Sequence, residues 1–80
     1  MPKLPQVSGD ALVRMLRSLG YEVLRQRGSH ATLSRSDPSG SHRITVPRHR
    51  TVAKGTLSDI RSQVAVRTGV PKDELLARIR

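Results

Sequence analysis

The apolar residues change their spacing at Gly20, and this change limits the possible fold more than any other feature of the sequence. Before Gly20 they recur every three or four positions, as on one face of an α-helix: Leu12, Met15, Leu16 and Leu19. Ser8 suits the N-cap of this helix, Asp10 suits its first turn, and Gly20 suits its end. We therefore expect a helix over about residues 8–20, with one face on a core.

Beyond Gly20 the sequence contains short runs that are typical of β-strands. The runs cover residues 21–26, 30–34 and 42–46. Gly28-Ser29 separates the first two runs as a tight hairpin turn, and residues 35–41 are all of types that form turns or loops. This order predicts a three-stranded antiparallel meander.

Two more helices are expected after the strands. Residues 47–55 read as a basic loop, and Thr56 with Asp59 three residues later has the spacing of a capping box. The helix that begins there should end near residues 68–69, and Pro71 should start a last short helix. The predicted order is α-β-β-β-α with a short C-terminal helix. This is an α+β two-layer sandwich with the architecture of double-stranded-RNA-binding domains.

The length of the chain limits its organisation. Eighty residues are enough for one domain, so residues 1–80 are assigned to a single domain. Residues 1–7, with two prolines among the first five, are expected to be a loose lead-in.

The chain is strongly basic, with 15 Lys and Arg against 6 Asp and Glu and a formal net charge of +9. Such a domain can bind nucleic acid, an anionic membrane or an acidic protein. No apolar run approaches the roughly 20 residues that span a bilayer, and the N-terminus lacks a signal-peptide core. We therefore expect a cytoplasmic protein that does not bind membranes.

Aromatic, cysteine and histidine usage narrows the choice further. Tyr21 is the one aromatic residue, which argues against a surface that stacks bases on several exposed rings. There is no cysteine, and the three histidines lack the spacing of a metal site, so neither a metal ion nor another cofactor is expected. The phosphates of a nucleic acid are the best remaining partner.

The alternation of apolar and polar residues predicts which face of the sheet meets water. If Leu33 lies opposite Ile44, the apolar side chains of both strands face the core, whereas a slip of one residue would expose half of them. This register places four side chains on the open face: His30, Thr32, Arg43 and Thr45. His42 has the other parity and lies at the far end of its strand, so it is a poor acid–base partner for His30.

Positive charge gathers in the middle of the chain. Between residues 25 and 54 there is one acid, Asp37, and there are seven basic residues: Arg25, Arg27, Arg35, Arg43, Arg48, Arg50 and Lys54. This segregation indicates a one-sided phosphate-binding surface, although a basic face without a specific partner has the same pattern. Arginine donates paired hydrogen bonds to phosphate, so we expect Arg43, Arg48 and Arg50 to hold phosphates.

His30 is the candidate for chemistry, although a histidine at a hairpin turn is more often an ordinary surface residue. It follows Gly28-Ser29, where the missing glycine side chain lets a phosphate approach the backbone. It also lies within the basic segment. A neutral imidazole at this place can take a proton from a ribose 2′-hydroxyl.

Two segments of the sequence resemble the HicA family of toxins. The first is a helix that ends in Leu19-Gly20-Tyr21, followed by Arg-Gln-Arg-Gly-Ser-His over residues 25–30. The second is Thr-Val-Pro-Arg-His-Arg over residues 45–50, followed by Lys-Gly-Thr-Leu over residues 54–57. Both occur in the family's order and spacing, and the resemblance extends over residues 8–79.

The resemblance implies a double-stranded-RNA-binding-domain-like fold and metal-independent cleavage of mRNA, which blocks translation. The family's catalytic histidine falls on His30, and its adjacent glycine falls on Gly28. The resemblance also implies a HicB-like antitoxin that covers the active site. Together with the charge pattern, it predicts RNA contacts from Gly28, Ser29, Arg43, Arg48, Arg50 and Lys54.

The sequence leaves several alternatives open. One histidine does not supply both proton transfers of in-line cleavage, and the second carrier can be water, Lys54, or His49 if the basic loop folds back. The same surface also fits a non-catalytic module that binds RNA or DNA. A third possibility is a protein-interaction domain whose basic face binds an acidic partner.

Overall fold

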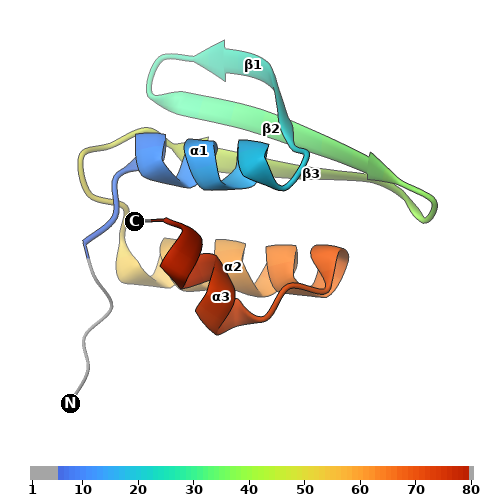
Figure 1. Ribbon diagram of the computed structural model, residues 1–80. Coiled ribbons are helices and arrows are strands. Elements are labelled where there is room, and N and C mark those ends of the chain that lie inside the picture. Colours follow the sequence, from blue (N-terminus) through green and yellow to red (C-terminus); the bar gives the residue numbers. More distant parts are fainter. Residues whose placement is uncertain (1–5, 80) are drawn as a thin grey trace.

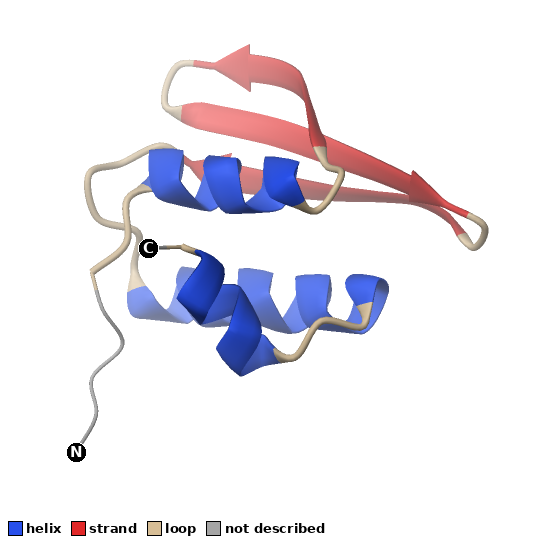
Figure 2. Ribbon diagram, viewed as in Figure 1, coloured by secondary structure: helices blue, strands red, loops and turns tan. Residues whose placement is uncertain are grey.

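The computed structural model describes residues 6–79, and its elements follow the predicted order. They are α1 (Gly9–Ser18), β1 (Glu22–Arg27), β2 (His30–Asp37), β3 (Gly40–Pro47), α2 (Lys54–Thr68) and α3 (Lys72–Arg78). The strands form one antiparallel sheet in the order β1-β2-β3, and the helices gather on one side of it (Figure 1). Figure 2 shows the two layers, with the sheet in red and the helices in blue. The predicted α+β sandwich, with a double-stranded-RNA-binding-domain-like order of elements, is confirmed.

The first helix begins where the sequence predicts. The Ser8 hydroxyl accepts a hydrogen bond from the Ala11 backbone N–H at 3.1 Å and so caps the helix. Gly20 follows the helix with a φ of 96°, a conformation that residues with a side chain rarely adopt. The predicted apolar stripe faces the core, where its members Leu12, Met15 and Leu16 are buried.

The sheet has the predicted register. Leu33 of β2 lies opposite Ile44 of β3, and the Gly28-Ser29 turn sets Arg27 opposite His30. The face toward the helices carries four buried side chains from β2 and β3: Ala31, Leu33, Ile44 and Val46. These side chains pack with α1, α2 and α3 into one hydrophobic core.

The second turn is shorter than predicted. β2 continues to Asp37 and β3 begins at Gly40, so Pro38 and Ser39 form the turn in place of residues 35–41. The Asp37 carboxylate closes it by accepting hydrogen bonds from the backbone N–H and the hydroxyl of Ser39, at 2.8 and 2.5 Å. With the turn closed in this way, residues 35–37 pair with residues 40–42 and lengthen both strands.

The predicted capping box of the second helix is wrong. α2 begins at Lys54, and its N-cap is Ala53, whose side chain makes no capping hydrogen bond. Thr56 and Asp59 therefore lie inside the helix and not at its start. The predicted end is correct, because Gly69 follows α2 with a φ of 76°. Pro71 then precedes α3, as the sequence predicts.

The predicted lead-in over residues 1–7 is largely outside the described residues, since the structure describes the chain from residue 6. Of its residues that the structure does describe, Val7 belongs to the hydrophobic core. This side chain is buried, and its carbonyl accepts a hydrogen bond from the Val52 N–H at 2.7 Å. The pairing of Val7 with Val52 places the chain before α1 beside the chain before α2.

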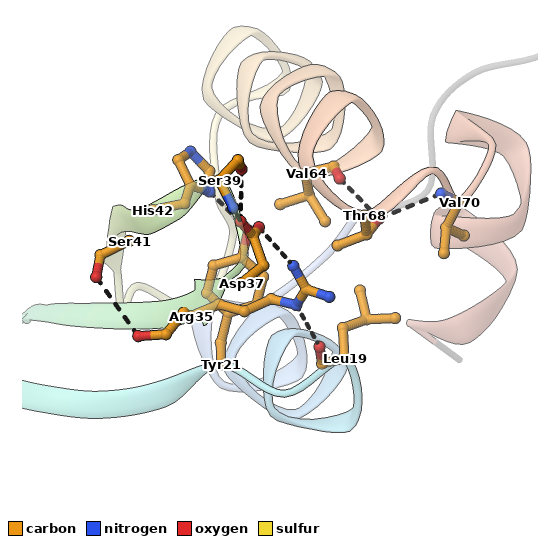
Figure 3. Close-up of polar contacts among 11 residues, drawn as sticks. Leu19, Tyr21, Arg35, Asp37, Ser39, Ser41, His42, Val64, Thr68 and Val70 are labelled. Atoms are coloured by element: carbon orange, nitrogen blue, oxygen red, sulfur yellow. Dashed lines mark hydrogen bonds and ion pairs between the residues drawn. The ribbon is translucent and has the colours of Figure 1, made fainter.

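A set of polar contacts holds the end of the sheet farthest from the β1–β2 turn (Figure 3). The hydroxyl of buried Tyr21 lies 2.6 Å from Nδ1 of His42. Arg35 donates hydrogen bonds to the Leu19 carbonyl and to the Asp37 carboxylate, both at 3.0 Å. Burial raises the pKa of Tyr21, and the hydrogen bonds from Ser39 lower the pKa of Asp37. His42 thus takes part in the structure of this end, away from His30.

Candidate nucleic-acid interface

The open face of the sheet carries polar and basic side chains. His30, Arg43 and Thr45 are exposed there, and the hydroxyl oxygens of Thr32 and Thr45 lie 3.4 Å apart across β2 and β3. The residues between them in each strand point into the core, so the predicted assignment of faces is confirmed.

β1 adds two arginines to the same face. Arg25 lies opposite Thr32, and Arg27 lies opposite His30, so each arginine shares the face of its partner. Both side chains are exposed. The predicted RNA contacts do not include these two arginines, although a two-residue turn at 28–29 already sets Arg27 opposite His30.

A hollow of about 210 Å³ opens on this face. Its lining comes from β1, β2 and β3: Leu24, Arg25, Thr32 and Arg43. Arg25 and Arg43 therefore border one hollow from the two outer strands. Two guanidinium groups in this arrangement suit neighbouring phosphates of a nucleic-acid chain.

The loop after β3 returns to the start of α1 and to the β1–β2 turn. The Gly9 N–H donates a hydrogen bond to the His49 carbonyl at 2.9 Å, and the Arg48 N–H donates one to the Ser29 carbonyl at 2.5 Å. Both bonds use the backbone, so they fix the path of residues 48–49. The loop that the sequence predicts as basic is thus held against two other parts of the chain.

Gly9 allows this close approach. A Cβ at position 9 would overlap the carbonyl oxygen of Pro47 and the Cα of Arg48. Both atoms belong to backbone and cannot swing aside as a flexible side chain does. Residue 9 is glycine because the backbone of the loop occupies the space of a side chain.

The Arg48 side chain holds the same loop. Its Nε donates to Oδ1 of Asp10 at 2.7 Å, its Nη2 lies 2.6 Å from the same oxygen, and its Nη1 donates to Oε1 of Gln26. Asp10 thus pairs with a cation besides lying in the first turn of α1. A phosphate contact from Arg48 stays a prediction, and it would use a guanidinium that two side chains already orient.

The folded loop places His49 beside His30. The centres of the two imidazole rings are 6.2 Å apart, with their planes at 70° to each other, and both residues are exposed. His49 is one of the three candidates for the second proton carrier that the sequence offers, on condition that the basic loop folds back. The loop does fold back in this way.

The other residues predicted to contact RNA lie in the β1–β2 turn, in the loop after β3 and at the start of α2. Gly28 has a φ of 53°, a left-handed conformation that favours glycine. The turn therefore favours glycine here independently of any approach of a phosphate. Arg50 is exposed on the loop after β3, and Lys54 is exposed as the first residue of α2. His42 lies five residues along β3 from Pro47, the residue opposite His30. The structure therefore groups His30 with His49 and separates both from His42.

The described residues offer neither a metal site nor a membrane-spanning helix. Within residues 6–79, no three His, Asp or Glu side chains gather closely enough to hold a metal ion. Over the same range, none of the helices has the length and apolar character needed to cross a membrane.

The fold and the site define a class, that of small α+β domains with basic and histidine side chains on the open face of the sheet. Residues 9–66 match the model of a family described as the HicA toxin of bacterial toxin-antitoxin systems. The match covers more than half of the chain, so the chain belongs to the HicA toxin family. Membership implies a role as the toxin of such a system, with an antitoxin as its partner. Neither a search of curated proteins nor a search of solved structures gives a match.

Proposed function

We propose that this toxin is a metal-independent endoribonuclease that cleaves mRNA in the cytoplasm and so blocks translation. His30 acts as a catalytic acid or base on the ribose 2′-hydroxyl or the leaving oxygen. The observation that carries this proposal is the position of His30, exposed at the start of β2 and directly opposite Arg27. Membership of the HicA toxin family supports it.

The charge around His30 provides the means to hold RNA. Arg25 and Arg43 border the hollow on the open face, and Arg50 and Lys54 are exposed on the adjoining loop and helix. With a net charge of +9, the chain attracts a polyanion, and its arginines form charge-assisted hydrogen bonds with phosphates. Gly28 and Ser29 provide backbone groups at the turn beside His30.

An antitoxin of the HicB type would silence this enzyme by covering the same face. The exposed arginines that attract RNA also attract acidic side chains of a protein partner. Such a partner and RNA would then compete for one surface, and loss of the partner would release the activity.

Expression in bacteria tests the proposed function. Wild-type chain is expected to arrest growth with loss of full-length mRNA, and His30→Ala at the same protein level is expected to do neither. Co-expression of a HicB-like antitoxin should restore growth. Arrest by His30→Ala equal to that of wild type would instead support a non-catalytic RNA-binding module.

A further inference from the structure

His49 lies where a second proton carrier is needed. In-line cleavage of RNA requires a base that takes the proton of the 2′-hydroxyl and an acid that protonates the leaving 5′-oxygen. The two oxygens lie on opposite sides of the phosphorus, and each must be about 2.6–3.2 Å from its proton carrier. Two exposed imidazoles with centres 6.2 Å apart can therefore flank one phosphodiester.

We propose that His30 and His49 form an acid–base pair, in which one imidazole is the general base and the other is the general acid. This proposal rests on the proposed ribonuclease function and assigns the proton transfer that a single histidine leaves open. His42 is not a competitor, because its ring faces Tyr21 at the other end of the sheet.

The reaction balances without any further reactant. The 2′-oxygen forms a bond to phosphorus, its proton passes to the neutral imidazole, and the bond from phosphorus to the 5′-oxygen breaks. The protonated imidazole gives its proton to that 5′-oxygen. The products are a 2′,3′-cyclic phosphate and a 5′-hydroxyl, and the two rings end with their protonation states exchanged.

The anchoring of the loop explains how an exposed histidine keeps a fixed place. The residue before His49 is held through its backbone to Ser29 and through its side chain to Asp10. The carbonyl of His49 itself accepts a hydrogen bond from Gly9. None of these bonds uses the His49 ring, so they hold the loop without engaging the imidazole.

Charged groups near the two rings come from three parts of the chain. Arg27 of β1 lies opposite His30, while Arg48 and Arg50 flank His49 in the loop. Asp10 of α1 is paired with Arg48. A phosphodiester bound between the rings would therefore lie in a positive field that supports its charge as the transition state forms.

Single-turnover cleavage in EDTA over a range of pH tests the pair, using an RNA oligonucleotide with wild type, His30→Ala and His49→Ala. A base that must be neutral and an acid that must be protonated give a bell-shaped pH profile. We expect each variant to be slower by about 10²–10⁴-fold, the usual contribution of one proton-transfer group. One variant should lose the acidic limb of the profile, and the other should lose the alkaline limb.

A second substrate identifies the acid. Sulfur in place of the bridging 5′-oxygen leaves without protonation, so this substrate should restore most of the rate of one variant and not of the other. His42→Gln, which removes a histidine outside the pair and keeps a side chain that can form a hydrogen bond with Tyr21, is the matched control and should cleave at the wild-type rate. Melting curves establish that all variants are folded.

The outcomes separate the two proposals. If wild type does not cut RNA, the ribonuclease function fails and the pair fails with it. If wild type and His49→Ala cut at the same rate, the pair fails and the ribonuclease function stands. The pair also fails if His49→Ala is slow but keeps both limbs of the pH profile and neither variant gains from the sulfur substrate, since His49 would then only help to bind or position RNA.

Discussion

Arg48 and Asp10 are 38 residues apart in the sequence, and their side chains form an ion pair with an N–O distance of 2.6 Å. The pair joins the loop after β3 to the first turn of α1, next to the two histidines. Asp10 also benefits from its position at the positive end of the helix dipole.

Asp10→Asn is therefore expected to lower the free energy of unfolding by about 1 kcal/mol, since a partly exposed ion pair contributes about 0.2–1 kcal/mol and the dipole adds a similar amount. Chemical denaturation at low salt measures this loss, and added salt should reduce it. Asp59→Asn, an exposed change inside α2, is the control. Equal losses from both variants would contradict a specific role for the pair.

Gly9→Ala is expected to destabilise the protein by about 1–3 kcal/mol or more, because the new Cβ would overlap the backbone of Pro47 and Arg48. Gly55→Ala is the matched control, since a Cβ there meets no atom within 4 Å and alanine favours helix. The control should gain up to about 1 kcal/mol. Thermal or denaturant unfolding distinguishes the two, and a neutral result at position 9 would disprove the close approach of the loop.

Arg43→Ala is expected to weaken RNA binding and to reduce its salt dependence. For single-stranded RNA, the slope of log affinity against log salt should become less steep by about 0.7 for each phosphate contact that is lost. Arg14→Ala, an exposed arginine on α1, is the control and should leave the slope unchanged. A flat salt response of wild type would contradict phosphate binding by this face altogether.

Tyr21→Phe is expected to cost about 0.5–1.5 kcal/mol of stability at neutral pH, because the hydrogen bond with His42 is lost. RNA cleavage should not change, since this contact lies far along the sheet from His30. Stability and cleavage are measured on the same samples. A loss of cleavage without a loss of stability would show that the two ends of the sheet are coupled.

The same variant should change the response to alkaline pH. Burial raises the pKa of Tyr21 above its ordinary value of 10.0, so ionisation of this group opposes folding. Its contribution to stability is complete below pH 10.0 and is lost as the pH rises through the raised pKa. Above pH 10.0, the free energy of unfolding obtained from denaturation curves should therefore fall more steeply with pH for wild type than for Tyr21→Phe. Parallel curves would contradict the raised pKa.

Asp37→Asn should change the response to acid. The hydrogen bonds from Ser39, together with the charges of Arg67 and Arg35, hold the pKa of Asp37 below its ordinary value of 3.8. The stability that this carboxylate contributes is fully present above pH 3.8 and is lost as the pH falls through the lowered pKa. The difference in unfolding free energy between wild type and Asp37→Asn should shrink over that range, and a difference that stays constant would contradict the lowered pKa of Asp37.

Local patterns in the sequence predicted most of the fold. The helical stripe before Gly20 and the alternation around Leu33 and Ile44 depend on near neighbours and on one register, and the structure confirms both. The predicted bounds of the second turn and the predicted start of α2 are wrong for a physical reason. Strand pairing took up residues with turn propensity, and the chain before α2 is fixed by Val52 pairing with Val7 and not by a side-chain cap.

The grouping of residues around His30 could be predicted only in part. The parity of the strands put His30 and Arg43 on the open face, because both lie in regular strands. The place of His49 depends on an irregular loop and on contacts with Gly9 and Asp10, about 40 residues earlier. Periodicity carries no information about such contacts. The sequence alone therefore makes His49 one candidate for the second proton carrier and cannot select it over water or Lys54.

Cleavage of a defined RNA oligonucleotide in EDTA by purified wild type and His30→Ala, with the product ends identified by mass, tests the role of His30 in a metal-independent ribonuclease. Both proteins should have the same helix and strand content and bind the oligonucleotide with similar affinity. We expect wild type to give 2′,3′-cyclic phosphate and 5′-hydroxyl ends, and His30→Ala to leave nearly all of the RNA intact over the same time, because its cleavage is about 10²–10⁴-fold slower. Intact RNA with both proteins, or equal cleavage by both, would contradict a metal-independent ribonuclease centred on His30.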